Sequence, residues 1–171
     1  MPILHHGLGH DPVLGGLAQT TRFVVQSTGR RRVPSSLISE AIGPEFANWF
    51  YFTGIRQSPT MQQPVCVTEL FLHRRAAAAS SLVGQEFTLI YQLVERACGE
   101  RMRRGRVQLI PCRLNRRQAA SVAAPAGALG IQIVRRLYNQ GDELLEVTNT
   151  VCPADRIGIE IGYDLPSSDG G

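Results

Sequence analysis

The chain contains no lysine, so its positive charge rests on arginine alone. Its 18 arginines stand against 14 acidic residues and give a formal net charge of +4. This usage, together with abundant alanine, glycine and valine, indicates the mutational bias of a GC-rich bacterial genome. The arginines occur in scattered clusters, such as those at 30–32 and 103–104. Such scatter permits contact with nucleic acid without requiring it, and it is equally typical of a solvated surface.

Metal-ligating motifs are also missing. None of the four cysteines lies in a Cys-x-x-Cys pair, which leaves zinc and thiol-redox motifs unsupported and favours reduced, buried thiols in a cytosolic protein. His5, His6 and His10 have no acidic or cysteine partner at ligand spacing. We therefore expect neither a metal nor a cofactor.

No apolar run approaches the roughly 18 residues needed to cross a bilayer, and the N-terminus has no secretory signal pattern. We expect a cytoplasmic protein with no membrane partner. With 171 residues and 43% hydrophobic content, the chain is long and apolar enough for one globular domain. We expect a flexible lead-in at 1–18, a folded domain at 19–166 and a disordered tail at 167–171.

One pattern occurs twice. Arg56 is followed twelve residues later by Thr68, and eighty residues further on Arg136 is followed twelve residues later by Thr148. Each copy has the pattern of a strand, a polar turn and a second strand, preceded by a helix-like stretch. The repeat favours a duplicated fold whose seam is a natural ligand cleft. Coincidental spacing is the alternative, since hairpins share turn chemistry.

The remaining patterns complete an α+β fold with one antiparallel sheet and helices packed on it, because strands outnumber helices and neighbouring strands pair as hairpins. A turn is expected at 29–34, between the first strand and the first helix. The expected strands cover 20–27, 49–55, 65–72, 107–112, 131–138 and 144–151, and the expected helices cover 35–43, 85–98 and 115–124.

Four segments resemble one family, the UTRA domain, which is the effector-sensing domain of HutC-type GntR transcription regulators. The segments read TTRFVVQSTGRRRVPSSLISEAIG, PVCVTELFLH, FTLIYQLVERACGERMRRG and LLEVTNTVCPADRIGIEI. The resemblance covers about residues 18–165. It implies the chorismate-lyase-like fold, with an antiparallel sheet, helices on one side of it and a duplicated topology, and it implies a homodimer.

Family members carry a winged helix-turn-helix before this domain, and the chain has no such segment. Either this is an excised effector domain or its DNA-binding half was lost. DNA binding is thus expected only through a domain absent from this chain.

The two arginines of the repeat are candidate anion ligands. The resemblance implies that a basic residue at Arg56 contacts anionic groups of effectors, and the repeat extends this role to Arg136. A guanidinium offers a planar, permanently charged fork that suits carboxylate or phosphate. Both could equally be surface arginines at strand ends.

A second candidate group lies at the start of the long helix, where free N–H groups favour anions. The resemblance implies an anion-binding Ser-Leu-Tyr segment here. Tyr91 matches its tyrosine, while Leu89 occupies the serine position with Thr88 beside it. Tyr91 could instead pack in the core.

The third group lies on strands. Relatives have a sugar-binding glutamate where this chain has Thr68, which disfavours a sugar phosphate, while Glu146 matches the family's second ligand-contacting glutamate. Strand alternation places Glu146, Thr148 and Thr150 on one face, either around a ligand or exposed. Ser58 completes the expected cleft.

The sequence therefore predicts a non-catalytic sensor of a small anionic or zwitterionic metabolite. Two alternatives remain. The first is a chorismate-lyase-like enzyme in which Arg56 and Glu146 bind substrate, and the second is a dimerisation module without ligand.

Overall fold

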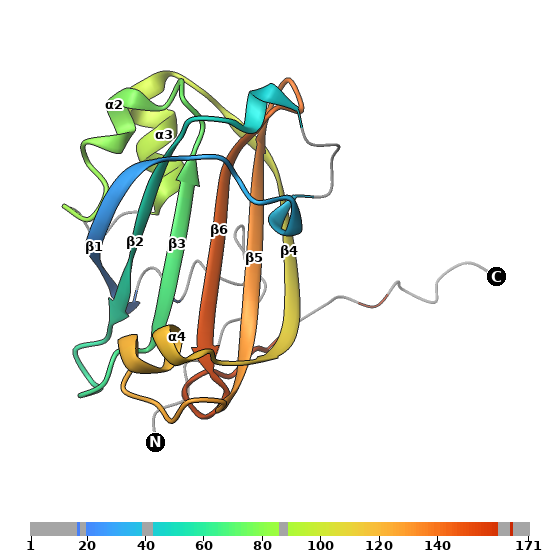
Figure 1. Ribbon diagram of the computed structural model, residues 1–171. Coiled ribbons are helices and arrows are strands. Elements are labelled where there is room, and N and C mark those ends of the chain that lie inside the picture. Colours follow the sequence, from blue (N-terminus) through green and yellow to red (C-terminus); the bar gives the residue numbers. More distant parts are fainter. Residues whose placement is uncertain (1–16, 18–19, 39–42, 86–88, 161–164, 166–171) are drawn as a thin grey trace.

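Six strands form one antiparallel sheet, which confirms the expected α+β class (Figure 1). The computed structural model describes residues 17, 20–38, 43–85, 89–160 and 165. The strand order is β1-β2-β3-β6-β5-β4. The strands are β1 (Arg22–Arg31), β2 (Trp49–Gln57), β3 (Cys66–Leu72), β4 (Met102–Arg113), β5 (Leu129–Asn139) and β6 (Leu144–Pro153). The expected lead-in and tail lie outside the described residues, except Leu17.

Short helices cover both faces of the sheet, so the expectation of helices on one side alone is wrong. The first face, called the α3 face, packs against α2 (Ala77–Ser80) and α3 (Ile90–Cys98) through side chains such as Leu70. The opposite face, called the α4 face, carries Tyr51 and Phe71 and packs against α4 (Arg116–Ser121) and two 3-10 turns. These two turns are η1 (Ser35–Leu37) and η2 (Pro44–Phe46), and a third 3-10 turn, η3 (Ala154–Arg156), follows β6.

The sheet is built from two equivalent halves. Strands β1, β2 and β3 occupy one half and β4, β5 and β6 the other, with β3 and β6 paired at the centre. Glu69 lies directly opposite Asn149, its counterpart eighty residues later. A pseudo-twofold axis therefore passes through this pair, which confirms the duplicated architecture.

The structure corrects the segment between β1 and β2. Within the described residues, the helix expected over 35–43 is only the turn η1, and Ile38 is already extended. The turn expected over 29–34 begins later than expected, because β1 continues to Arg31. Arg30 and Arg31 lie over the rings of Phe50 and Tyr51, 3.5 and 4.2 Å from the ring centres, and these contacts extend the strand.

Elsewhere the signals at the ends of elements hold, but the long helix expected over 85–98 begins only at Ile90, since Gln85 lies in a turn and Leu89 is extended. α3 ends at Gly99, whose φ of 69° is the left-handed conformation expected there. α4 begins with a capping box between Asn115 and Gln118. The last hairpin turns through Asn139, whose side-chain oxygen accepts from the amides of Gly141 and Glu143. The short helix α2 had no recognised sequence signal.

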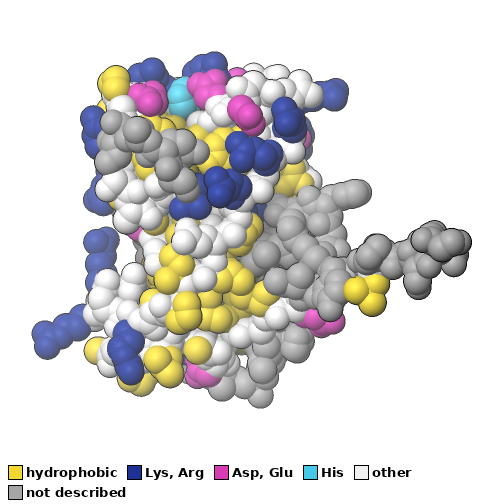
Figure 2. All heavy atoms as spheres, turned by 90° about the vertical axis from the view of Figure 1, so that its right-hand side faces the viewer, with side chains coloured by type: hydrophobic (Ala, Val, Ile, Leu, Met, Phe, Trp, Pro, Cys, Tyr) yellow, Lys and Arg dark blue, Asp and Glu magenta, His cyan; other side chains and the backbone are white. Residues whose placement is uncertain are grey.

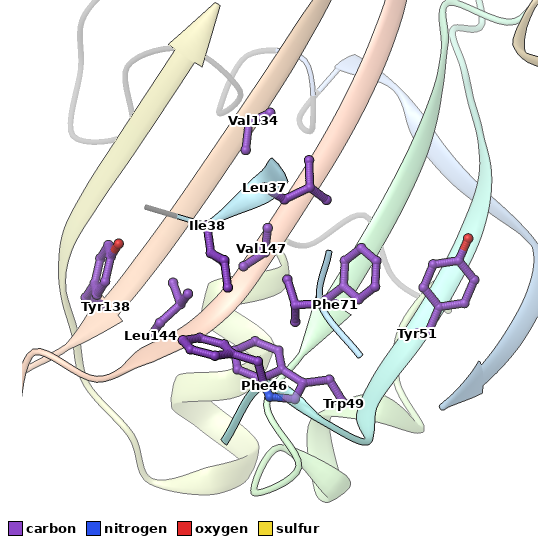
Figure 3. Close-up of a cluster of buried hydrophobic side chains, with 11 residues drawn as sticks. Leu37, Ile38, Phe46, Trp49, Tyr51, Phe71, Val134, Tyr138, Leu144 and Val147 are labelled. Atoms are coloured by element: carbon purple, nitrogen blue, oxygen red, sulfur yellow. The ribbon is translucent and has the colours of Figure 1, made fainter. Parts of the chain in front are cut away.

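A hydrophobic cluster fills the end of the α4 face that η1 and η2 cover (Figure 3). It joins side chains of η1 and η2 to inward-facing residues of four strands, with Trp49 only 1% exposed. The indole Nε1 donates to the Glu45 carbonyl at 2.7 Å, which satisfies its one polar group. Among the described helices, none is long and apolar enough to cross a membrane.

Stability should fall on mild acidification because of His73. The ring is 5% exposed and lies edge-on to Trp49 at 5.1 Å. Burial lowers the pKa of His73 below its usual 6.5, and this outweighs the opposing effect of Glu143, whose carboxylate lies 3.6 Å away. Arg74 and Arg75 also lower this pKa, whereas Glu100 raises it.

The unfolded chain then binds the proton more readily than the folded chain. The contribution of His73 to stability is present above pH 6.5 and is lost as the pH falls through the lower folded pKa. Urea unfolding at about pH 7.5 and about pH 5.5 should show a smaller pH dependence in His73→Gln than in the parent. Equal dependence in both proteins would contradict this.

Candidate functional site

A small cavity opens on the α3 face at the seam between the two halves of the sheet. Its volume is about 20 Å³, room for about one water molecule. The start of α3 covers the floor that β2, β3, β5 and β6 provide. The lining residues are Arg56, Thr68, Leu89, Ile90, Arg135, Glu146, Thr148 and Thr150.

A buried ion pair dominates the floor. Arg135 Nη2 donates to Glu146 Oε1 at 2.9 Å, and the side chains are 5% and 0% exposed. Both lie on the α3 face because Arg135 is opposite Thr148 in the β5–β6 ladder and Glu146 is two residues from Thr148. Two such charges are stable here only while each compensates the other.

Arg56 brings a second positive charge to the cavity. Its guanidinium lies 5.4 Å from the Phe23 ring centre, and Nη1 donates to Thr21 Oγ1 at 3.4 Å. Burial lowers the pKa of Arg56 from its usual value, and the charge of Arg135 acts in the same direction, whereas Glu146 opposes it. The group still remains protonated at neutral pH, because an unperturbed guanidinium titrates far above it.

Threonine hydroxyls complete the polar lining. Thr68 and Thr150 face each other across the β3–β6 seam, with their Oγ1 atoms 3.0 Å apart. Thr148 Oγ1 is buried and has no hydrogen-bond partner among the described residues. A buried hydroxyl without a partner costs free energy, so a bound polar molecule that reaches it gains an available contact.

Two buried thiols, Cys66 and Cys152, lie at the same end of the α3 face. Hydrogen bonding with Cys66, followed by burial, raises the pKa of Cys152 well above its usual value. Cys152 is therefore a neutral thiol at physiological pH. All four cysteines are free.

The structure brings together four of the eight residues that the sequence suggested: Arg56, Thr68, Glu146 and Thr148. Ser58 lies beyond the cavity lining in the turn after β2, where its hydroxyl bonds that of Thr60 at 2.9 Å. Tyr91 is in the first turn of α3 as expected, yet it does not line the cavity either. Thr88 lies outside the described residues.

Arg136, which the sequence suggested as a ligand-binding residue, does not line the cavity, whereas its neighbour Arg135 does. Arg136 lies on the α4 face, where Nε donates to the Leu37 carbonyl and Nη2 to Gln108 Oε1 at 3.2 Å. The repeat breaks in the pairing register. Gly54 lies opposite Thr68, so a strict repeat would place Val134 opposite Thr148, but Arg135 occupies that position. A shift of one residue reverses the face of a strand, so Arg136 faces away from the cavity and its neighbour Arg135 faces it.

Sequence reasoning missed Arg135, Leu89 and Ile90 as lining residues. Only the pairing register across the last hairpin distinguishes Arg135 from Arg136, and the sequence pattern did not fix that register. The two apolar residues lie at the start of α3 and owe their place to helix packing, which carries no polar signature. Among the described residues, no group of three or more histidines, cysteines or carboxylates could hold a metal ion.

The site is thus a small polar cavity with two arginines and one carboxylate under an apolar cover. Its chemistry suits binding of a compact polar molecule that bears negative charge.

Comparison with known proteins gives a family match and a set of similar folds. The family model of the UTRA domain matches residues 55–157. No curated protein matches the chain significantly.

Several solved structures share the fold. PhnF from Mycobacterium smegmatis is 15% identical with a TM-score of 0.76, covering 97% of this chain and 74% of that one. The effector domain of the same PhnF is 14% identical with a TM-score of 0.74, covering 94% and 99%. A third structure, from Bordetella bronchiseptica, is described as the ligand-binding domain of a GntR-family transcriptional regulator. It is 20% identical with a TM-score of 0.61, covering 80% and 87%.

Proposed function

The chain belongs to the UTRA domain family, and from this premise we propose that it senses a small anionic or zwitterionic metabolite in the α3-face cavity. It is a ligand-sensing regulatory domain of chorismate-lyase-like fold. The proposed effector contacts Arg56, Arg135 and Glu146 and is bound without being transformed.

The charge of Arg56 carries this proposal. Glu146 is paired with Arg135, and Arg56 makes no ion pair with any residue in the described part of the chain. The cavity therefore has one excess positive charge, which favours an anionic group. A zwitterion satisfies the site equally, because its cationic or hydroxyl group can donate to Glu146 or Thr148.

The small volume of the cavity implies that the effector opens it. At about 20 Å³ the present cavity is closed to any metabolite. Leu89 and Ile90 form its cover with apolar side chains, whereas further along α3 the Met102 amide of β4 donates to Glu95 Oε1 at 2.9 Å. We expect the effector to displace the start of α3 from the sheet, giving the two states that a sensor requires.

The direct test is a thermal-shift screen of the chain against anionic, zwitterionic, neutral and cationic metabolites. A ligand that binds only the folded state raises the unfolding midpoint in proportion to its occupancy. We expect hits among the anions and zwitterions, and we expect Arg56→Ala to abolish them while Arg22→Ala, an exposed arginine of β1, keeps them. Hits restricted to cations, or hits unaffected by Arg56→Ala, would overturn the proposal.

In an intact cytoplasmic regulator, effector binding would bias how two subunits place their winged helix-turn-helix domains on DNA. The proposed homodimer has an available surface at the β4 edge, which faces the viewer in Figure 2. Among the described strands β4 pairs with β5 alone, and Leu109 and Leu129 at this edge are 38% and 63% exposed. Unpaired edges favour association.

Light scattering should therefore give twice the monomer mass of 18.8 kDa. A change of Leu129 to Glu should shift the protein towards monomer, because it places a charge in the proposed contact. A monomer mass for the parent at high concentration would rule out the dimer and leave the effector site untouched.

A further inference from the structure

A second polar cavity lies on the α4 face, on the opposite side of the sheet from the effector site. Its volume is about 240 Å³, just below the roughly 300–1,000 Å³ of pockets for drug-sized ligands. In Figure 1, α4 crosses in front of the lower part of the sheet and forms one wall. The lining residues are Gln26, Ser27, Tyr51, Thr53, Val67, Glu69, Asn115, Arg117, Gln118, Ser121, Asn149 and Val151.

A hydrogen-bond network holds the floor of this cavity in place. Tyr51 donates to Glu69 Oε1 at 2.8 Å, and Asn149 Nδ2 donates to Glu69 Oε2 at 2.9 Å. Gln132 Nε2 in turn donates to Asn149 Oδ1 at 2.9 Å. Burial, together with the hydrogen bond and charge of Glu69, raises the pKa of Tyr51, so the phenol stays a proton donor. The carboxylate is thus oriented before any ligand arrives.

The wall that α4 forms is also held in place by hydrogen bonds. The capping box at the start of α4 uses the side-chain oxygens of Asn115 and Gln118, since Gln118 N donates to Asn115 Oδ1 at 2.8 Å and Asn115 N donates to Gln118 Oε1 at 3.0 Å. Their NH₂ groups remain as donors to the cavity. Thr53, Ser27 and Ser121 contribute hydroxyls, which both donate and accept.

The charges of the cavity balance. Among the described residues of the lining, Glu69 is the one carboxylate and Arg117 the one guanidinium. Every other polar lining residue is a hydroxyl or an amide, and Val67 and Val151 supply a small apolar floor. Such a surface offers many neutral hydrogen bonds and no excess charge, which matches a neutral molecule that carries several hydroxyl groups.

We propose that the α4-face cavity is a second ligand site, for a neutral polyhydroxylated molecule of about the size of a cyclitol. Glu69 and Asn149 accept from and donate to its hydroxyl groups, with Thr53, Gln118 and Ser121 around them. This site is independent of the effector site in charge and in lining residues.

The two sites nevertheless share strands. Thr68 and Thr148 line the effector cavity, while their neighbours Glu69 and Asn149 line the second cavity on the other side of β3 and β6. A ligand that changes the spacing of these strands on one side changes it on the other. Binding at either site should therefore alter affinity at the other by the same factor.

The test uses nuclear magnetic resonance on the full chain with myo-inositol as probe, glycerol as a smaller neutral probe and inorganic phosphate as an anionic probe. We expect myo-inositol to shift the side-chain NH₂ signals of Asn149, Gln132 and Gln118 saturably, and more strongly than glycerol does. Phosphate should instead shift the Nε–H signal of Arg135. The opposite assignment of neutral and anionic probes would overturn the proposal, and so would the absence of any saturable shift with myo-inositol up to its solubility.

Two variants and a control complete the experiment. Glu69→Gln removes the charged acceptor and should weaken myo-inositol binding by roughly tenfold or more. Ser27→Tyr changes an exposed residue of the lining, fills the cavity and should abolish binding with the fold intact, even if Glu69→Gln is unstable. Glu45→Gln, an exposed carboxylate outside this cavity, should leave binding unchanged. Unchanged affinity in both Ser27→Tyr and Glu69→Gln would place the ligand elsewhere, with no bearing on the effector site.

Discussion

Replacing Arg135 by alanine should lower the free energy of unfolding by about 3–5 kcal/mol, the typical cost of breaking a buried ion pair. The variant leaves the Glu146 carboxylate, which is 0% exposed, without the guanidinium that lies 2.9 Å away in the parent. Taking a charged hydrogen-bond partner from a buried carboxylate costs far more than the pair itself contributes. Urea unfolding of the purified variant measures the loss directly.

Two comparisons make this test specific. Arg104→Ala breaks a surface pair with Asp142 whose side chains are 40% and 60% exposed, and it should cost no more than about 1 kcal/mol. The double change of Arg135 to Met and Glu146 to Leu removes both charges and should be considerably more stable than Arg135→Ala. If Arg135→Ala lowers the free energy of unfolding no more than Arg104→Ala does, the Arg135–Glu146 pair is hydrated in solution. The description of the cavity as closed is then wrong.

Replacing Arg56 by alanine should weaken effector binding about ten- to a hundredfold, because one charge-assisted contact contributes about 1.5–3 kcal/mol. The loss should be specific to binding. Arg56 is half-buried at the end of β2, and its one side-chain hydrogen bond to a described residue, with Thr21, is long at 3.4 Å. Calorimetry with the effector identified by the screen gives the affinity, and thermal unfolding shows that the fold is intact.

Matched variants distinguish a direct contact between Arg56 and the effector from a general effect of positive charge on affinity. Arg22→Ala removes one exposed charge from the neighbouring strand and should change affinity little. Arg56→Lys keeps the charge without the planar fork, and it should fall between the parent and Arg56→Ala if the effector is held bidentately. Unchanged affinity in Arg56→Ala would make Arg56 a surface residue and would remove the observation on which the effector site depends.

Residue pattern alone was sufficient for the duplicated architecture and for most strand positions. Alternation placed Glu146, Thr148 and Thr150 on one face, and the ladders confirm it. The signals of Gly99 and Asn139 at the ends of elements also hold, because both depend on local backbone conformation. These features are short-range, so neighbouring residues are enough to determine them.

Local signals were less reliable where tertiary contacts compete with them. The segment after β1 has helical spacing, yet its described part forms only the turn η1, because Val33, Leu37 and Ile38 are drawn into the cluster around Trp49. Burial of these side chains outweighs a weak helix preference. Tertiary contacts also extend β1 beyond its expected end, because contacts with aromatic rings hold Arg30 and Arg31 in the strand.

The choice between Arg135 and Arg136 shows what only the tertiary structure decided. Composition, spacing and the repeat place an arginine doublet beside the seam, but they do not say which member faces the cavity. That depends on a pairing register that differs by one residue between the two hairpins. Because side chains alternate along a strand, this single step moves one guanidinium to the effector cavity and the other to the α4 face. The sequence alone thus determined that arginine, glutamate and threonine side chains lie near the seam, whereas the register of the folded sheet determined which arginine faces the cavity.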